Sequence, residues 1–150
     1  KQIEAGAEVI KIFDSWAGLL GPNDFVNYSI KPINKIISSL KKMYPKIPII
    51  VFPRGANQFY KGFAKKTGAQ SVAIDQSISL SFMKALQAET CVQGNLDPTL
   101  MVNGGKELLD ATKNIRDKMA EGPHIFNLGH GITPDANPKN VELMLKALRG

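Results

Sequence analysis

Short apolar runs rich in β-branched residues alternate along this chain with longer stretches of helical period. The longest apolar run, Ile-Pro-Ile-Ile-Val-Phe, occupies residues 47–52. We expect strands near residues 8–13, 47–52, 71–75, 90–94 and 124–128, and helices near residues 23–29, 32–44, 57–67, 79–87, 105–120 and 138–149. Near-continuous apolar strands separated by helices indicate an α/β fold built on a parallel sheet.

Two α/β architectures contain such a series, and the residues after the first strand favour one of them. A doubly wound open sheet normally carries a glycine-rich phosphate turn at this point, but here the residues are Asp14-Ser15-Trp16-Ala17-Gly18. A (β/α)8 barrel needs about 250 residues. This chain has 150, and it begins at Lys1, without a methionine, in what looks like the end of a helix stopped by Gly6. We therefore expect residues 1–150 to be the C-terminal part, about five βα units, of a single (β/α)8 TIM-type barrel domain.

The composition is that of an ordinary globular protein, with 43% hydrophobic and 21% charged residues. The longest apolar run is far shorter than the roughly 20 residues of a membrane helix, so no membrane association is expected. Cys91 is the only cysteine, which excludes an intrachain disulfide, fits a reducing compartment and favours a cytoplasmic location. The net charge of +6 comes mainly from scattered lysines. This pattern does not favour nucleic acid as a partner, and it allows some attraction for an acidic small molecule.

Polar residues follow every predicted strand, at the edge where parallel α/β folds bind their ligands. His130 stands out because Gly129 and Gly131 leave its imidazole unshielded. His124 begins the last predicted strand, at the opposite end of the sheet, and we expect no chemical role for it. The other polar residues at the ligand-binding edge are Asp14, Ser15, Arg54, Asp75, Asn95, Asp97 and Asn127.

Some polar residues are expected to shape the structure rather than to react. Asp97-Pro98 and Pro134-Asp135 have the composition of turns or helix caps. Lys11 is unusual, because the alternation of a strand puts it on the same face as Ser15. An ammonium without a partner is costly on such a face, and the sequence does not identify a partner for it.

Three blocks of sequence, together, resemble the C-terminal half of the uroporphyrinogen decarboxylase family. They are Phe13–Gly18 (FDSWAG), Gln93–Pro98 (QGNLDP) and Phe126–Asp135 (FNLGHGITPD). Their order and spacing agree with the family along the whole chain. The resemblance implies a somewhat distorted (β/α)8 barrel, usually a homodimer, with one deep cleft per subunit at the barrel mouth.

The resemblance also implies an activity, that of a carboxy-lyase. The family removes the carboxyl groups of the four acetate side chains of uroporphyrinogen, giving coproporphyrinogen for haem and other tetrapyrroles. No metal or prosthetic group is implied, because a pyrrole protonated at carbon can itself accept the electrons released with CO₂. Ser15 corresponds to a residue that hydrogen-bonds a substrate carboxylate. His130 corresponds to the histidine that contacts a substrate carboxylate near the reacting ring, so it is expected to be both catalytic and substrate-binding.

Other family features fit less directly. The family's arginine pair, its pyrrole-binding aspartate and a tyrosine correspond to positions upstream of residue 1. Arg54 stands where lysine is also common, so the positive charge is kept. Asp14, Asp75, Asn95 and Asp97 are expected to shape the loops.

Two alternative functions are considered. A zinc- and cobamide-linked methyltransferase of the same fold uses a His-x-Cys pair before Gly-Asn, where this chain has Cys91-Val92-Gln93. Gln93 is a poor zinc ligand and no second cysteine is present, so no metal is expected. The other alternative is an inactive barrel fragment that serves only as a scaffold. The isolated chain is expected to be inactive in any case, because half of the family's site residues are absent from it.

Overall fold

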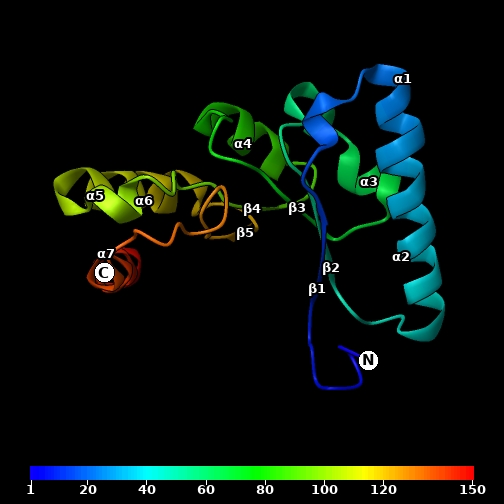
Figure 1. The fold of residues 1–150 in the computed structure, drawn as a ribbon, viewed down its shortest axis with the longest axis horizontal. Coiled ribbons are helices and arrows are strands. Elements are labelled where there is room, and N and C mark those ends of the chain that lie inside the picture. Colours follow the sequence, from blue (N-terminus) through cyan, green and yellow to red (C-terminus); the bar gives the residue numbers. More distant parts are fainter.

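Five parallel strands form one sheet in the computed structural model, which describes residues 1–150 throughout. The strands are β1 (Ile10–Asp14), β2 (Ile49–Pro53), β3 (Ser71–Ala73), β4 (Cys91–Gln93) and β5 (His124–Ile125). Their order in the sheet, β1-β2-β3-β4-β5, is also their order along the chain (Figure 1). The predicted strands are therefore confirmed, although the last three are shorter than expected.

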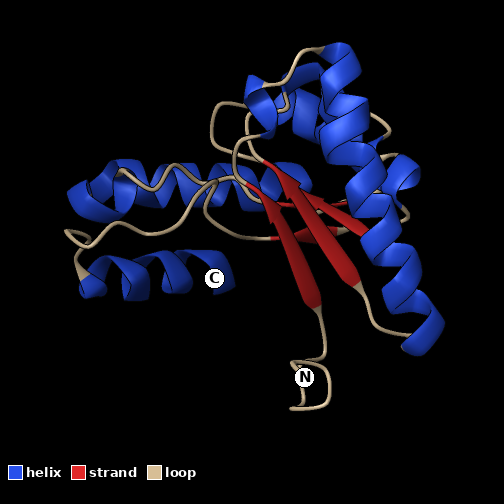
Figure 2. Cartoon of the chain, turned by 45° about the vertical axis from the view of Figure 1, so that its right-hand side comes forward, coloured by secondary structure: helices blue, strands red, loops and turns tan.

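The helices contact only one face of this sheet. They are α1 (Pro22–Phe25), α2 (Lys31–Met43), α3 (Phe63–Thr67), α4 (Leu80–Gln87), α5 (Leu100–Asn103), α6 (Gly105–Met119) and α7 (Pro138–Arg149), shown in blue in Figure 2. Ile49, Val51, Val72 and Val92 point toward the helices and belong to a core of 19 buried residues. Ile50, Phe52 and Ala73 alternate with them and form a small separate cluster on the opposite face.

We call that opposite face the inner face. Its residues are Lys11, Phe13, Ile50, Phe52, Ser71, Ala73, Cys91, Gln93 and Ile125. A doubly wound sheet reverses its strand order at one point and has helices on both faces. A sequential parallel order with helices on one face is the arrangement of a barrel wall, because each right-handed βα crossover places its helix on the same side.

The helix predicted over residues 23–29 and the one predicted over residues 32–44 are a single continuous run, visible as one long column in Figure 1. Helix α1 passes through a wider π-helical turn, η2 (Val26–Ile30), into α2. The cause is Pro32, which has no N–H to donate and whose ring crowds the carbonyl four residues earlier. The turn widens there, and the N–H of Lys31 donates to the carbonyl of Val26, five residues back.

Three further predictions of local structure are corrected. The helix expected over residues 57–67 is a 3-10 turn, η3 (Asn57–Tyr60), followed by α3, because Gly62 interrupts it with a φ of 69°. Helix α5 was not expected, and Asp97 precedes it, accepting hydrogen bonds from the backbone N–H and hydroxyl of Thr99, both at 2.9 Å. Residues 2–6 form turns rather than the end of a regular helix.

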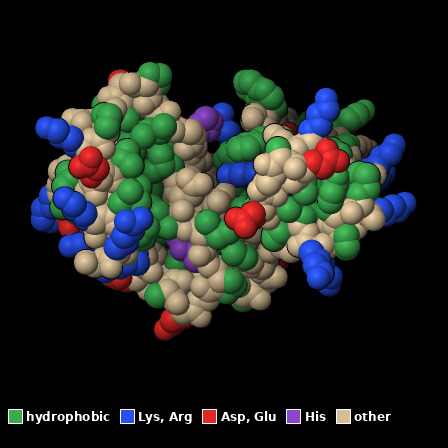
Figure 3. All heavy atoms as spheres, turned by 90° about the horizontal axis from the view of Figure 1, so that it is seen from below, with side chains coloured by type: hydrophobic (Ala, Val, Ile, Leu, Met, Phe, Trp, Pro, Cys, Tyr) green, Lys and Arg blue, Asp and Glu red, His purple; other side chains and the backbone are tan.

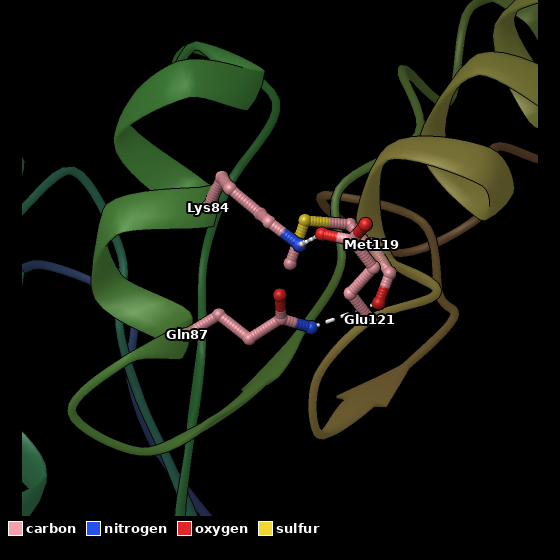
Figure 4. A network of polar contacts seen from close by, with 4 residues as sticks. All are labelled: Lys84, Gln87, Met119 and Glu121. Atoms are coloured by element: carbon pink, nitrogen blue, oxygen red, sulfur yellow. Dashed lines mark hydrogen bonds and ion pairs between the residues drawn. The ribbon is translucent and has the colours of Figure 1, made fainter.

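A polar contact between α4 and the end of α6 holds the chain where it enters β5 (Figure 4). The buried amide of Gln87 donates to the carbonyl of Met119 at 2.9 Å, and Lys84 pairs with Glu121 at 3.2 Å. The first bond satisfies a carbonyl that the helix end leaves without a partner. The exposed ion pair contributes little. A Cβ at position 122 would lie 2.5 Å from Cδ of Gln87, so a larger residue than Gly122 would displace the side chain that makes this bond.

Candidate active site

The loops that follow β1 and β2 lie back to back at the carboxyl end of the sheet. The N–H of Gly18 donates to the carbonyl of Arg54 at 2.9 Å, and the N–H of Arg54 donates to the carbonyl of Asp14 at 3.0 Å. A Cβ on Gly18 would lie 2.6 Å from the carbonyl oxygen of Gly55, so only glycine permits this approach. The two loops border an open surface hollow of about 320 Å³, here called the Ser15 hollow, which is lined by Ser15, Trp16, Gly18, Leu19, Arg54 and Gly55.

The Ser15 hollow offers polar groups that the chain itself does not use. Ser15 and Arg54 are exposed. Arg54 takes part in none of the four ion pairs of the chain. Beside them the side chain of Trp16 is 72% exposed. A free guanidinium, a hydroxyl and an aromatic face together suit a ligand that has carboxylates on an apolar body.

Asp75 connects the loops that follow β2 and β3 at this end of the sheet. Its carboxylate accepts hydrogen bonds from the N–H of Gly55 at 2.8 Å and from the hydroxyl of Tyr60 at 2.7 Å. The backbone N–H of Ser77 donates at 2.9 Å, and the Ser77 hydroxyl donates as well. Burial raises the pKa of Asp75, but these hydrogen bonds together outweigh burial and hold the pKa below its usual value. The carboxylate is fully engaged, in accord with its expected role in shaping the loops.

Asn95 continues this connection to the loop after β4. It is buried, and its amide donates to the carbonyl of Asp75 at 3.0 Å and to the carbonyl of Ile78 at 2.8 Å. The side chains of Asn95 and Asp97 therefore bind neighbouring parts of the chain, as expected. Sequence motifs alone do not identify the partners of Asn95, because they lie in another loop, the one after β3.

His130 is exposed, and its imidazole is oriented by its own loop. Its Nδ1 accepts a hydrogen bond from the N–H of Gly131 at 2.7 Å. A ring nitrogen that accepts a hydrogen bond carries no proton, so the neutral ring has its proton on Nε2. In this tautomer Nε2–H, which has no partner within the chain, is available to donate to a ligand.

His124 is engaged within the protein. Its Nε2 lies 2.7 Å from the carbonyl of Gly94, an acceptor, so Nε2 carries the proton. Burial lowers the pKa of His124, and the bond to Gly94 opposes that effect only in part. The imidazole leans from the start of β5 toward the loop after β4 and supports that loop.

The partner of Lys11 is Gln93, a residue that sequence reasoning did not connect with it. Lys11 Nζ donates to Oε1 of Gln93 at 2.7 Å. The signal in the sequence was slight: both residues point to the inner face, but they lie on β1 and β4, which are not neighbours in the sheet.

Ser15 and His130 lie at the same end of the sheet but at its opposite margins. They follow β1 and β5, which are the outermost strands. Figure 3 likewise shows the two histidines as separate purple groups, with the blue lysines and arginines spread around the face rather than gathered. No group of three or more His, Cys, Asp or Glu side chains is arranged to hold a metal ion. None of the helices is long and apolar enough to cross a membrane.

Parallel strands in sequential order, helices on one face and polar groups at the carboxyl ends define the class of this protein. It is part of a (β/α) barrel, a class in which ligands bind at the carboxyl ends of the strands. The sequence model of uroporphyrinogen decarboxylase (URO-D) matches residues 1–150. The chain belongs to the uroporphyrinogen decarboxylase family, so the resemblance and the α/β barrel class are confirmed.

Several relatives bear the same name. A uroporphyrinogen decarboxylase of Cereibacter sphaeroides is 54% identical over 152 residues, which cover 100% of this chain and 44% of the relative. The enzyme of Paracoccus denitrificans is 55% identical over 150 residues, covering 99% of this chain and 44% of the relative. The enzyme of Rhodobacter capsulatus is 53% identical over 151 residues. The chain thus spans less than half the length of these relatives and covers only part of the family's barrel.

Proposed function

We propose that the full-length protein containing this chain is a carboxy-lyase that converts uroporphyrinogen to coproporphyrinogen by decarboxylating its four acetate side chains. The observation that carries the proposal is the family match over all of residues 1–150, with relatives of that name about 54% identical. The free guanidinium, hydroxyl and imidazole groups at the carboxyl ends of the strands support it, because the substrate is a polycarboxylate.

The residues of this chain bind and orient carboxylates in the proposed reaction. Nε2–H of His130 donates to a substrate carboxylate near the reacting ring, and the Ser15 hydroxyl donates to another. Arg54 adds positive charge beside Ser15. The substrate supplies its own electron sink. A pyrrole protonated at carbon accepts the electron pair of the breaking carbon–carboxyl bond, and CO₂ leaves. A second proton then converts the new carbon centre to a methyl group, and the ring carbon gives up the first proton, which restores the pyrrole.

The test uses the full-length protein with uroporphyrinogen under anaerobic conditions. Mass spectrometry of the product measures the loss of four CO₂. His130→Ala and Ser15→Ala are each expected to lower kcat/KM roughly ten- to a hundredfold, because a hydrogen bond to a charged group is worth about 1.5–3 kcal/mol. His124→Ala is the control and is expected to affect stability more than kinetics. Parental kcat/KM in His130→Ala together with lost activity in His124→Ala would show that the site is wrongly assigned.

A chelation experiment separates this proposal from a zinc- and cobamide-linked methyltransferase. Gln93, the residue at the position of that group's second ligand, already binds Lys11 through its side-chain oxygen. Activity is expected to survive exhaustive chelation. Activity that disappears with chelator and returns with zinc would favour the methyltransferase.

The remaining alternative concerns the isolated chain, which serves only as a scaffold if it cannot react. Residues 1–150 alone are expected to show no turnover, because sheet edges remain unpaired and the family's upstream site residues are absent. Turnover by the homogeneous isolated chain would contradict the site assignment.

We also infer a cytoplasmic homodimer for the full-length protein, as the family resemblance and the single cysteine indicate. Light scattering that gives the mass of one chain would contradict the dimer.

A further inference from the structure

The ammonium of Lys11 lies higher in the sheet than its own backbone does. The backbone of Lys11 is in register with Ile50, which is in register with Ser71 and, through it, with Cys91. Its ammonium nevertheless binds Gln93, which is two residues further along β4 than Cys91. The side chain therefore extends toward the carboxyl ends of the strands, where the Ser15 and His130 loops begin.

The next row of inner-face side chains surrounds this ammonium. Phe13 is in register with Phe52, and Gln93 is in register with Ala73 and Ile125. Lys11 Nζ lies 5.0 Å from the ring centroids of both Phe13 and Phe52. The two rings meet edge to face at a centroid distance of 6.1 Å. We call this row, with the Lys11 ammonium among its side chains, the mouth floor, because it lies directly below the loops that carry the candidate site.

Within residues 1–150, no carboxylate neutralises the positive charge on the mouth floor. Lys11 is absent from the four ion pairs of the chain, and its one hydrogen-bond partner is a neutral amide. Partial burial lowers its pKa, which reflects the cost of holding this charge out of water. Two aromatic faces and one amide oxygen hold the ammonium in place but leave it capable of further donation, since an ammonium has three N–H groups.

We propose that the Lys11 ammonium binds one carboxylate of the substrate at the mouth floor. This inference rests on the proposed function and adds a binding group to it. The carboxylate is one that the reaction leaves in place, because a cation paired with a reacting carboxylate would oppose the release of its electrons. Phe13, which lies on the same row, supplies an apolar surface for the macrocycle next to that charge.

The test compares Lys11→Met and Lys11→Arg in the full-length protein. Loss of the charge is expected to raise KM for uroporphyrinogen about tenfold, the low end for a hydrogen bond to a charged group, with the change falling on KM rather than on kcat. Lys11→Arg is expected to recover most of the affinity. The salt dependence of KM is expected to weaken in Lys11→Met only. Lys42→Met is the matched control, because Lys42 is exposed on α2 and should leave KM unchanged.

A second measurement keeps the proposal testable if Lys11→Met does not fold. Bound coproporphyrinogen is expected to protect Lys11 from an amine-reactive acylating reagent at least fivefold more than it protects Lys42, measured by peptide mass spectrometry of the parental protein. Equal protection of the two lysines, or a parental KM in a folded Lys11→Met variant, would overturn the inference. If the parental protein does not convert uroporphyrinogen at all, the proposed function fails instead.

Discussion

Asp75 offers the sharpest test of how the site is held together. Its carboxylate accepts hydrogen bonds from Gly55, Tyr60 and Ser77, and it joins the loops after β2 and β3. Asp75→Ala removes the acceptor but leaves the donors. Ser77 is exposed, so water can replace its bonds, whereas Tyr60 is fully buried and the N–H of Gly55 lies partly buried. At about 1–3 kcal/mol for each donor left without a partner, the expected loss of stability is about 2–6 kcal/mol.

The sign of the pH dependence follows from the same contacts. The pKa of Asp75 in the folded protein lies below its ordinary value of 3.8. Its contribution to the free energy of unfolding is therefore complete above about pH 4 and is lost as the pH falls through the folded pKa. Measurements near pH 7 record the whole contribution of the charged group.

The assay is urea denaturation of the full-length protein at pH 7 for Asp75→Ala, Tyr60→Phe and the double variant. Tyr60→Phe is expected to cost about 1.5–3 kcal/mol, because its hydroxyl binds a charged group. The double variant should cost less than the sum of the single variants by at least about 1 kcal/mol, since both remove the same bond. The reasoning would be refuted by additive costs or by a loss below about 1 kcal/mol for Asp75→Ala.

Three further predictions concern stability. Ser29→Ala should raise the free energy of unfolding by about 1 kcal/mol, because the hydroxyl of Ser29 is fully buried without a partner; a lower Tm would contradict this. Gly18→Ala should destabilise the protein by about 1–3 kcal/mol, because the added Cβ would collide with the backbone of Gly55. Gly21→Ala should not destabilise it, because the space around Gly21 is open. Equal Tm values for the two variants would refute the close approach of Gly18 to Gly55. Burial lowers the pKa of His124 below 6.5, so the contribution of the neutral imidazole to the free energy of unfolding is lost as the pH falls below that value. His124→Asn should therefore flatten the decline in Tm between pH 6.5 and 5. An unchanged Tm profile would count against this prediction.

Much of the fold followed from local patterns. The continuous apolar run of β2 predicts two buried faces, and the polar blocks after β1, β4 and β5 predict where a ligand site lies. The break at Gly62 and the π-helical turn before Pro32 were not expected. Both irregularities arise where a helix changes its winding or stops at one residue while it packs against its neighbours. The periodic pattern of apolar residues does not predict where this happens.

The sequence by itself determined the order of strands and helices, the family and the two candidate residues Ser15 and His130, because these depend on residue types and short spacings. Only the tertiary structure decided which face of the sheet the helices leave bare, that Asp75 joins the loops after β2 and β3, and that Lys11 reaches Gln93, which is 82 residues away. The physical reason is that the period of a strand determines which side chains share a face, whereas contacts across the sheet depend on the register and curvature of strands far apart in the chain.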